Sequence, residues 1–399
     1  MWYFFSPGII YGEDAIEFLQ NIAGQKCFIV TDKVLEELGY LKILTDKLDQ
    51  YGKNYEVYTD VRPDPTEEGV LKTKELLISY GPDIIIALGG GSVMDTAKSA
   101  WALYEYPEFG VDDLHPFNME LYNLGKKAKM VAIPTTSGTG AETTWAVVIS
   151  RYEEEVWKKL EQAHKGLVPT FAIVDPIFPA GMPPELTRDT AFDTLAHSVE
   201  GLVSVWRNEF SDALCVKAIE LVFKYLPIAY KDGNNMEARD FLHQAATIAG
   251  LGFGNGQAHM GHSMGHSWGA VFHTHHGRTV GLFLPYVTQY CLNNPDESDV
   301  STEILGRSAK KLGWANWADD NRKAAFVLID KLKELMKEVD LPMSLKDLGI
   351  SREDFDKNLS MLVNLCFQSS SSVMSPRSAN TEDYNKIFTY AYEGKDIDF

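Results

Sequence analysis

The first half of the chain alternates short apolar runs with longer amphipathic stretches. Apolar runs, predicted as strands, lie at residues 26–32, 54–61, 83–89, 129–136 and 170–175. Helices are predicted between them at residues 33–51 and 66–80. Runs that are apolar on both faces and alternate with helices are typical of a parallel sheet covered on both sides. The pattern therefore predicts an α/β domain whose ligands bind at the carboxyl ends of the strands.

The second half has a different pattern. After two prolines at positions 183 and 184 the strand signal disappears, and apolar residues recur with the helical period. Helices are predicted at residues 185–205, 210–230, 237–250, 257–271, 301–312, 323–339 and 354–366. We therefore expect two domains, an α/β domain at residues 1–182 and an all-helical domain at residues 183–399.

Length and composition agree with this division and disfavour some partners. The chain has 399 residues, 45% of them hydrophobic, which exceeds what one core usually serves. A net charge of −19 disfavours nucleic acid and anionic membranes as partners. No apolar run approaches the roughly 18 residues of a membrane span, and no basic amino-terminal segment indicates a signal peptide. The four cysteines are scattered, which favours reduced thiols and a cytoplasmic protein.

Histidine is concentrated in residues 257–277, which hold six of the ten histidines. On a helix, His259, His262 and His266 would share one face, because their spacing is i, i+3, i+7. The others in this stretch are His273, His275 and His276. Neutral imidazole is a common ligand for divalent transition metals, so the stretch predicts a metal site. The alternative is a buried histidine-rich helix without a metal.

The same stretch contains three glycines with the spacing i, i+4, i+8, namely Gly261, Gly265 and Gly269. Each glycine inside a helix costs roughly 0.5–1 kcal/mol relative to alanine. This cost implies the close approach of another backbone or of a ligand. Upstream, Asp193 and His197 lie at i, i+4 on a predicted helix and can reach one point. Alone, such a pair is commonly a surface ion pair; beside the histidine stretch it is a candidate for further metal ligands.

Two strand ends in the first half carry motifs suited to phosphate. Residues 87–98 run from a buried strand through three glycines into a helix, whose free N–H groups and dipole favour an anion. Residues 134–144 are rich in hydroxyls and glycine directly after a strand. Asp32 ends the first strand and could accept a hydrogen bond from a ribose 2′-hydroxyl. Structural turns, and an N-cap at Asp32, are the alternatives at these positions.

Together these motifs resemble the iron-containing (group III) alcohol dehydrogenases. The resemblance rests on Asp193-x-x-x-His197, His262-x-x-x-His266, the histidine–glycine pair at 276–277, GGGS-x-x-D-x-x-K at 89–98 and PTTSGTGAE at 134–142. It extends through VTDK (30–33), RPDPT (62–66), VDP (174–176) and SPR (375–377), and so covers nearly the whole chain. It implies a dehydroquinate synthase-like architecture, with a Rossmann-like dinucleotide-binding domain followed by an all-α metal-binding domain.

The resemblance also implies site residues. The metal ligands are expected to be Asp193, His197, His262 and His276, with His266 near the metal and substrate as a proton relay. The residues expected to contact the cofactor are Asp32, Asp64, Gly90, Gly91, Ser92, Asp95, Thr135, Thr136, Thr139, Thr144 and Lys159. The sequence departs from the family pattern in several places. Asp64 stands where asparagine is usual and His275 where proline is usual, and His259 and His273 are additional histidines. The usual Asp-Ala-Leu-Thr-His is Asp-Thr-Leu-Ala-His here, which keeps the two ligands.

The expected activity is metal-dependent hydride transfer between a primary alcohol or diol and the nicotinamide C4 of NAD(P). A divalent cation with one carboxylate and three neutral imidazoles keeps a charge of about +1, which suits a developing alkoxide. Ligand chemistry allows Fe²⁺, Zn²⁺, Ni²⁺ or Mn²⁺, and the resemblance favours Fe²⁺. Asp32 favours NAD(H) over NADP(H), because a carboxylate repels a 2′-phosphate.

Other functions remain open at this point. A glycerol-dehydrogenase-like polyol oxidase and a dehydroquinate-synthase-like lyase share the architecture, although basic residues, which the lyase needs, are scarce at 185–280. A non-catalytic metal-binding protein would not need the glycine-rich loops. The apolar first ten residues pair with a partner chain in the family, which implies a homodimer or a larger homo-oligomer.

Overall fold

The computed structural model describes residues 3–153, 156–296 and 299–399. The chain forms two compact units, Met1–Gly181 and Met182–Phe399. Each unit has its own hydrophobic cores.

The first unit contains a six-stranded sheet in which all neighbouring strands are parallel. In spatial order its strands are β1 (Gly8–Tyr11), β8 (Phe171–Val174), β5 (Lys129–Pro134), β4 (Ile84–Gly89), β2 (Lys26–Val30) and β3 (Asn54–Tyr58). The predicted α/β fold class is confirmed. The short edge strand β1 was not expected, because its four residues carry too little pattern.

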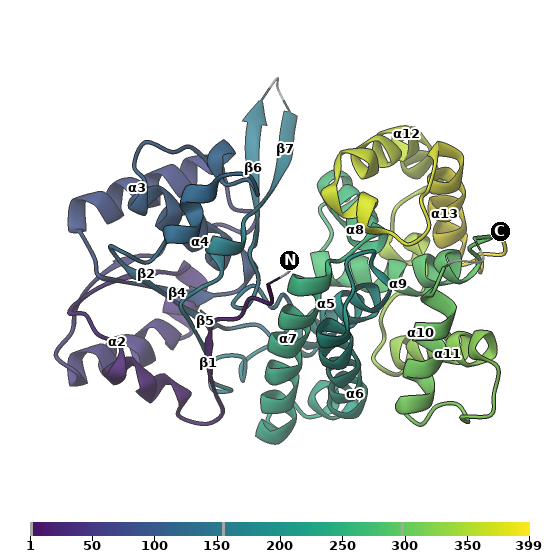
Figure 1. Cartoon of the computed structure of the whole chain (residues 1–399), viewed down its shortest axis with the longest axis horizontal. Helices are drawn as coiled ribbons and strands as arrows, with labels where there is room; N and C mark the ends of the chain where they lie inside the picture. The colour runs from purple at the N-terminus through teal and green to yellow at the C-terminus, as the bar shows by residue number, and fades with distance from the viewer. Residues whose placement is uncertain (1–2, 154–155, 297–298) are drawn as a thin grey trace. The chain divides into compact units, whose positions relative to one another are not determined.

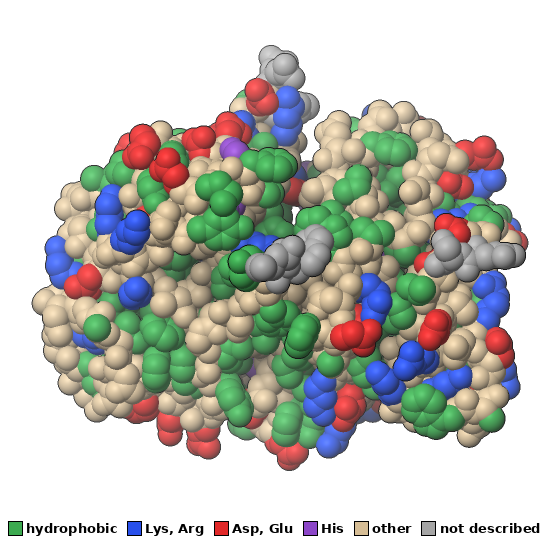
Figure 2. Space-filling model, viewed as in Figure 1, with side chains coloured by type: hydrophobic (Ala, Val, Ile, Leu, Met, Phe, Trp, Pro, Cys, Tyr) green, Lys and Arg blue, Asp and Glu red, His purple; other side chains and the backbone are tan. Residues whose placement is uncertain are grey.

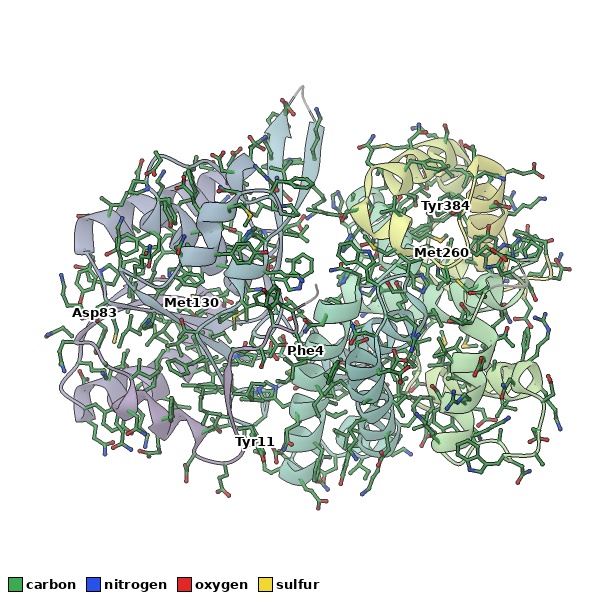
Figure 3. All side chains as sticks on the ribbon, in the orientation of Figure 1. Phe4, Tyr11, Asp83, Met130, Met260 and Tyr384 are labelled. Atoms are coloured by element: carbon green, nitrogen blue, oxygen red, sulfur yellow. The ribbon has the colours of Figure 1, made fainter. Side chains whose placement is uncertain are left out.

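Helices cover both faces of this sheet (Figure 1). One core lies between the sheet, α3 (Glu67–Tyr80) and α4 (Gly91–Glu105), and it includes Phe28 and Met130 (Figure 3). The opposite core packs Ile29 and Ile84 against α2 (Tyr40–Gln50). Strand residues alternate between the two cores, which explains why β4 reads as a continuous apolar run.

The first unit departs from the sequence prediction in two places. The helix predicted at 33–51 is two helices, α1 (Lys33–Glu37) and α2, because Gly39 adopts a left-handed φ of 83°. Residues 146–163, for which no element was predicted, form an antiparallel hairpin of β6 (Ala146–Glu153) and β7 (Val156–Ala163). Its lysines and glutamates hide the strand pattern.

Within the described residues of the second unit, all regular structure is helical, as predicted. Its α-helices are α5 (Pro184–Val203), α6 (Glu209–Lys231), α7 (Met236–Gly256), α8 (Met260–Phe272), α9 (His276–Leu292), α10 (Ser301–Lys311), α11 (Asn321–Glu338), α12 (Arg352–Gln368) and α13 (Thr381–Glu393). The periodicity predicted neither α9, which contains Pro285, nor α13.

Two cores hold the helical unit together. One joins α5, α6, α7, α9, α10 and α11, and the other joins α8, α9, α12 and α13, so α9 belongs to both. Met260 and Tyr384 belong to the second core (Figure 3). Helices α8 and α9 approach closely at Gly265, where an added Cβ would lie 2.4 Å from Cγ1 of Val280. The close approach expected for the glycine stripe is therefore present at this position.

The surface around α10 and α11 intersperses acidic and basic side chains (Figure 2). Ion pairs there include Arg307–Glu303 and Lys331–Glu334. No helix in the described part of the chain is long and apolar enough to span a membrane.

Candidate functional site

Three helices of the second unit bring one carboxylate and three imidazoles together. Helix α5 carries Asp193 and His197 one turn apart, α8 carries His262, and α9 begins at His276. The Oδ1 atom of Asp193 lies 3.4 Å from Nε2 of His276 and 3.7 Å from Nε2 of both His197 and His262. The structure thus gathers the four residues that the sequence proposed as metal ligands around one oxygen atom.

Burial leaves several of these polar atoms unsatisfied. Asp193, His197 and His262 are at most 5% exposed. Within the described residues, Asp193 Oδ1 and His262 Nε2 have no hydrogen-bond partner. Donor atoms of Asp193, His262 and His276 lie within 4.8 Å of one another, as ligands of one cation would. A buried, unsatisfied oxygen facing imidazole nitrogens is costly without a ligand, so the cluster fits a divalent transition metal.

The electrostatics of the cluster point the same way. Burial lowers the pKa of His197 to about 3 and also lowers the pKa of His276, so both rings stay neutral at neutral pH. Burial alone would raise the pKa of Asp193, but the nearby His197 and His276 outweigh it and hold this pKa well below its usual range. Around His262, burial is outweighed by the carboxylates of Glu200 and Asp193, which raise its pKa to about 10. His262 therefore favours a positive charge between the carboxylates of Asp193 and Glu200, either a proton or a cation.

One of the other histidines of the stretch departs from the prediction. His259 does not share a helix face with His262, because it is the N-cap of α8 and its backbone is not helical. His273 ends α8 with φ 53°, and His275 precedes α9 with a side chain that is 43% exposed. His266 does lie beside the cluster, with its ring centroid 5.0 Å from that of His276.

Two residues next to the cluster were missed from the sequence. Phe253 stacks on His197, with ring centroids 3.8 Å apart and an interplanar angle of 5°, and provides an apolar wall. Glu200 is fully buried, with Oε1 3.2 Å from Nδ1 of His262. Glu200 lies seven residues after Asp193 and three after His197, on the same helix as both, and this spacing could have revealed it.

In the first unit, the two glycine-rich segments converge. Gly90 is the N-cap of α4, directly after β4. An added Cβ at Gly90 would lie 3.2 Å from Oγ1 of Thr136, and one at Gly91 would lie 3.2 Å from Cγ2 of Thr139. Segments 87–98 and 134–144 therefore form one surface at the start of a 15-residue helix, where free N–H groups favour an anion.

Several residues expected to contact the cofactor already have partners within the protein. Asp32 caps α1 by accepting from the N–H of Leu35 at 3.0 Å. Asp95 accepts from the N–H of Val148 at 3.0 Å. The carbonyl of Thr144 accepts from the ammonium group of Lys98, the N–H of Thr135 donates to the carbonyl of Gly89, and the carbonyl of Ser92 accepts from the hydroxyl of Thr96. These contacts support the structural alternative at each position without excluding a ligand.

The two remaining expected contacts pair with each other. Asp64, in the loop before α3, forms an ion pair with Lys159 on β7. Asp64 adopts φ 65°, a conformation that asparagine and aspartate tolerate better than most residues. Asp64, where the family usually has asparagine, therefore pairs its carboxylate with Lys159, which the resemblance assigned to cofactor binding.

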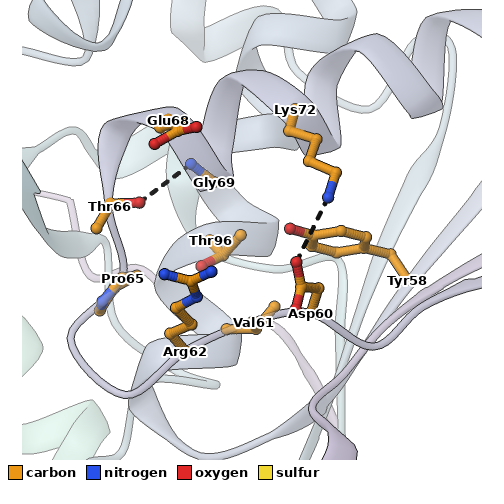
Figure 4. A pocket seen from close by; sticks show the side chains of 10 residues that line it. All are labelled: Tyr58, Asp60, Val61, Arg62, Pro65, Thr66, Glu68, Gly69, Lys72 and Thr96. Carbon is orange, nitrogen blue, oxygen red and sulfur yellow. Dashed lines mark hydrogen bonds and ion pairs between the residues drawn. The ribbon is translucent and has the colours of Figure 1, made fainter.

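A pocket of about 130 Å³ lies at the carboxyl end of β3 (Figure 4). Arg62 and Lys72 line it, together with Asp60, whose carboxylate is 3.4 Å from the ammonium group of Lys72. Asp60 also forms a backbone bridge with Asp32, so this pocket adjoins the end of β2. Its mixed charges make it a polar recess beside the glycine-rich surface.

Comparison with known proteins agrees with this geometry. The sequence profile described as iron-containing alcohol dehydrogenase matches residues 6–176, and the one described as Fe-containing alcohol dehydrogenase family, C-terminal, matches residues 187–392. The chain is 35% identical to an NADPH-dependent butanol dehydrogenase of Clostridium saccharobutylicum, over 98% of both chains. It is 35% identical to aldehyde-alcohol dehydrogenase 2 of Entamoeba histolytica, covering 98% of this chain but 46% of that protein.

Among solved structures, an iron-containing alcohol dehydrogenase from Thermococcus thioreducens superposes with a TM-score of 0.87 at 27% identity, covering 99% of this chain and 100% of that one. The fold and the metal-binding cluster define the class of metal-dependent, NAD(P)-linked alcohol dehydrogenases. Within that class, the chain belongs to the iron-containing alcohol dehydrogenase family.

Proposed function

We propose that Asp193, His197, His262 and His276 hold one Fe²⁺ ion and that the enzyme interconverts small primary alcohols and aldehydes. The observation that carries this proposal is the set of three imidazole nitrogens within 3.7 Å of the buried Oδ1 of Asp193. Zn²⁺, Ni²⁺ and Mn²⁺ suit the same ligands, so metal identity rests on the family. Elemental analysis of the purified protein tests this, and the absence of bound transition metal would contradict it.

Each residue has a proposed part in the reaction. A bound divalent cation would polarise the substrate oxygen as a Lewis acid and stabilise negative charge on it. Asp193 supplies the one negative ligand, and the neutral rings of His197 and His276 leave the positive charge uncancelled. Phe253 closes one side of the cluster and limits access of water. His266, whose ring is 5.0 Å from that of His276, is placed to move the hydroxyl proton toward solvent.

The proposed nucleotide-binding region is residues 1–182, and the proposed metal-binding region is residues 183–399. The pyrophosphate would lie on the N-terminus of α4 at Gly90, Gly91 and Ser92, with the hydroxyls of Thr135, Thr136 and Thr139 close by. In this arrangement Asp95 and Thr144 support the loop through their internal hydrogen bonds.

We propose a preference for NAD(H), because Asp32 at the end of β2 would repel a 2′-phosphate. The butanol dehydrogenase of Clostridium saccharobutylicum is NADPH-dependent, so the preference needs a direct test. The measurement is kcat/KM with NADH and with NADPH, for the wild type and for Asp32→Gly. A wild-type preference for NADPH would contradict this assignment.

The substrate and the oligomeric state are also proposals. Turnover on a panel of primary alcohols, diols and polyols separates an alcohol dehydrogenase from a polyol oxidase. Tyr3, Phe4 and Tyr11 are exposed beside or on the edge strand β1, and we propose that a second copy of the chain covers them. A monomer by light scattering would contradict this.

A further inference from the structure

A second carboxylate lies behind the proposed metal ligands. Glu200 is on α5, one turn after His197, and it is 0% exposed. Its Oε2 atom accepts from the N–H of His259 at 2.6 Å, and its Oε1 atom lies 3.2 Å from Nδ1 of His262. A buried carboxylate needs partners, because desolvation without them is costly. Oε1 and Nδ1 lie at ion-pair distance, although they are not aligned as a hydrogen bond.

The first turn of α8 is built around this carboxylate. His259 is the N-cap of α8 and His262 is three residues further along, so Glu200 faces the N-terminal end of the helix, where a negative charge is stabilised. Gly261 lies between them, and an added Cβ there would be 2.2 Å from Oε1 of Glu200. The glycine therefore leaves the space that the carboxylate occupies.

The two nitrogens of His262 face two different carboxylates. Nε2 lies 3.7 Å from Oδ1 of Asp193, and Nδ1 lies 3.2 Å from Oε1 of Glu200. A proton held on Nδ1 by Glu200 leaves the lone pair on Nε2 for a metal. Glu200 also places a second buried negative charge beside the cluster, outside the ligands of the metal.

We propose that Glu200 is a positioning residue, which keeps His262 in the Nδ1-protonated form with Nε2 directed at the metal, and that Gly261 exists to admit it. This inference rests on the metal centre proposed above. It assigns a role to the glycine of the histidine stretch that is nearest the start of α8. It also gives His259 a role away from the metal, because the backbone N–H of His259 donates a hydrogen bond to Glu200.

The test is the affinity for Co²⁺, measured by competition with a chromophoric chelator, together with the visible absorption spectrum of the Co²⁺-loaded protein. In Glu200→Gln a single oxygen cannot accept from both partners, and affinity is expected to fall about 10- to 100-fold with an altered spectrum. Glu200→Asp keeps the charge and both acceptor oxygens and should recover part of the affinity. Gly261→Ala should weaken binding by displacing the carboxylate.

Two further variants make the outcome decisive. Ser198→Ala is the matched control, because Ser198 is buried on the same helix and its hydroxyl donates to the carbonyl of Thr194, and this variant should bind Co²⁺ like the wild type. Asp193→Ala should lose binding. If Asp193→Ala loses Co²⁺ while Glu200→Gln and Gly261→Ala keep wild-type affinity and spectrum, the role of Glu200 is refuted and the metal centre stands. If Asp193→Ala also binds like the wild type, the metal centre itself is refuted.

Discussion

The strand-end loops of the first unit and the histidine cluster of the second differ in how their polar groups are satisfied. In the loops, Asp32, Asp95 and the carbonyl of Thr144 already have hydrogen-bond partners in the protein. In the cluster, Oδ1 of Asp193 and Nε2 of His262 are buried and find no such partner in the part of the chain that the structure describes. Because an unsatisfied buried group is costly, the cluster is shaped for a ligand, whereas the loops are stable without one. A metal centre is therefore recognisable from its own geometry, and a nucleotide site built on backbone N–H groups much less so.

The comparison predicts the largest effect at the cluster. Asp193→Ala removes the one negative ligand, so the protein should lose its transition metal, and kcat/KM should fall by more than about 10³-fold. Metal content by elemental analysis and steady-state kinetics measure this. His275→Ala is the control, since this partly exposed side chain is outside the cluster and the variant should keep its metal. Equal losses of metal and of kcat/KM in Asp193→Ala and His275→Ala would refute the distinction between the cluster and the side chains outside it.

Lys98 of the first unit sharpens the comparison between satisfied and unsatisfied buried groups. Its buried ammonium group donates hydrogen bonds to the carbonyls of Thr144 and Ala146. Burial lowers the pKa of Lys98 from 10.5 to about 8. Between these two pH values the unfolded chain binds more protons, so stability should rise with pH, by up to about 3 kcal/mol. Urea unfolding of the wild type and of Lys98→Met at pH 8 and pH 10 tests this. Parallel pH dependence in the two proteins would contradict it.

The loops should respond through the cofactor and not through the metal. In Gly90→Val the new side chain would meet Thr136, since even a Cβ lies 3.2 Å from its Oγ1, and the backbone approach to phosphate would be lost. We expect KM for the nicotinamide cofactor to rise at least about 10-fold, equivalent to 1.4 kcal/mol, with metal content unchanged. A variant that lost its metal, or kept its KM, would break the proposed division of labour.

The smallest effect is expected at the ion pair of Asp64 and Lys159. Asp64 is largely exposed, and such pairs contribute at most about 1 kcal/mol. Asp64→Asn should free Lys159 and lower KM for the cofactor by a factor of about 2–5, with the difference shrinking at high salt. Asp112→Asn breaks the ion pair with Arg151 on the same hairpin and is the control. An unchanged KM in Asp64→Asn would remove Lys159 from the cofactor site.

The sequence predicted the fold class because long apolar and amphipathic runs carry a clear period. It failed at β6 and β7, whose strands are rich in charged residues, at α9, which contains a proline, and at α13, for which no helix was predicted. The break at Gly39 depends on one positive φ angle, which a helical pattern does not show.

For the candidate site too, the sequence proposed some of the residues and missed others. Spacing brought Asp193 and His197 together, and the motifs of the family added His262 and His276. Glu200 and Phe253 were missed, because their roles depend on the packing of α5 and α7 against α8 and not on local spacing. His259 was placed wrongly on the helix face, since the point where α8 begins decides which residues share that face.

The most direct measurement is anomalous diffraction from crystals of the purified protein, collected on both sides of the iron absorption edge. The account predicts one anomalous peak bounded by Oδ1 of Asp193 and the Nε2 atoms of His197, His262 and His276, which weakens below the edge. Density without an anomalous peak there, with the protein fully active, would contradict it.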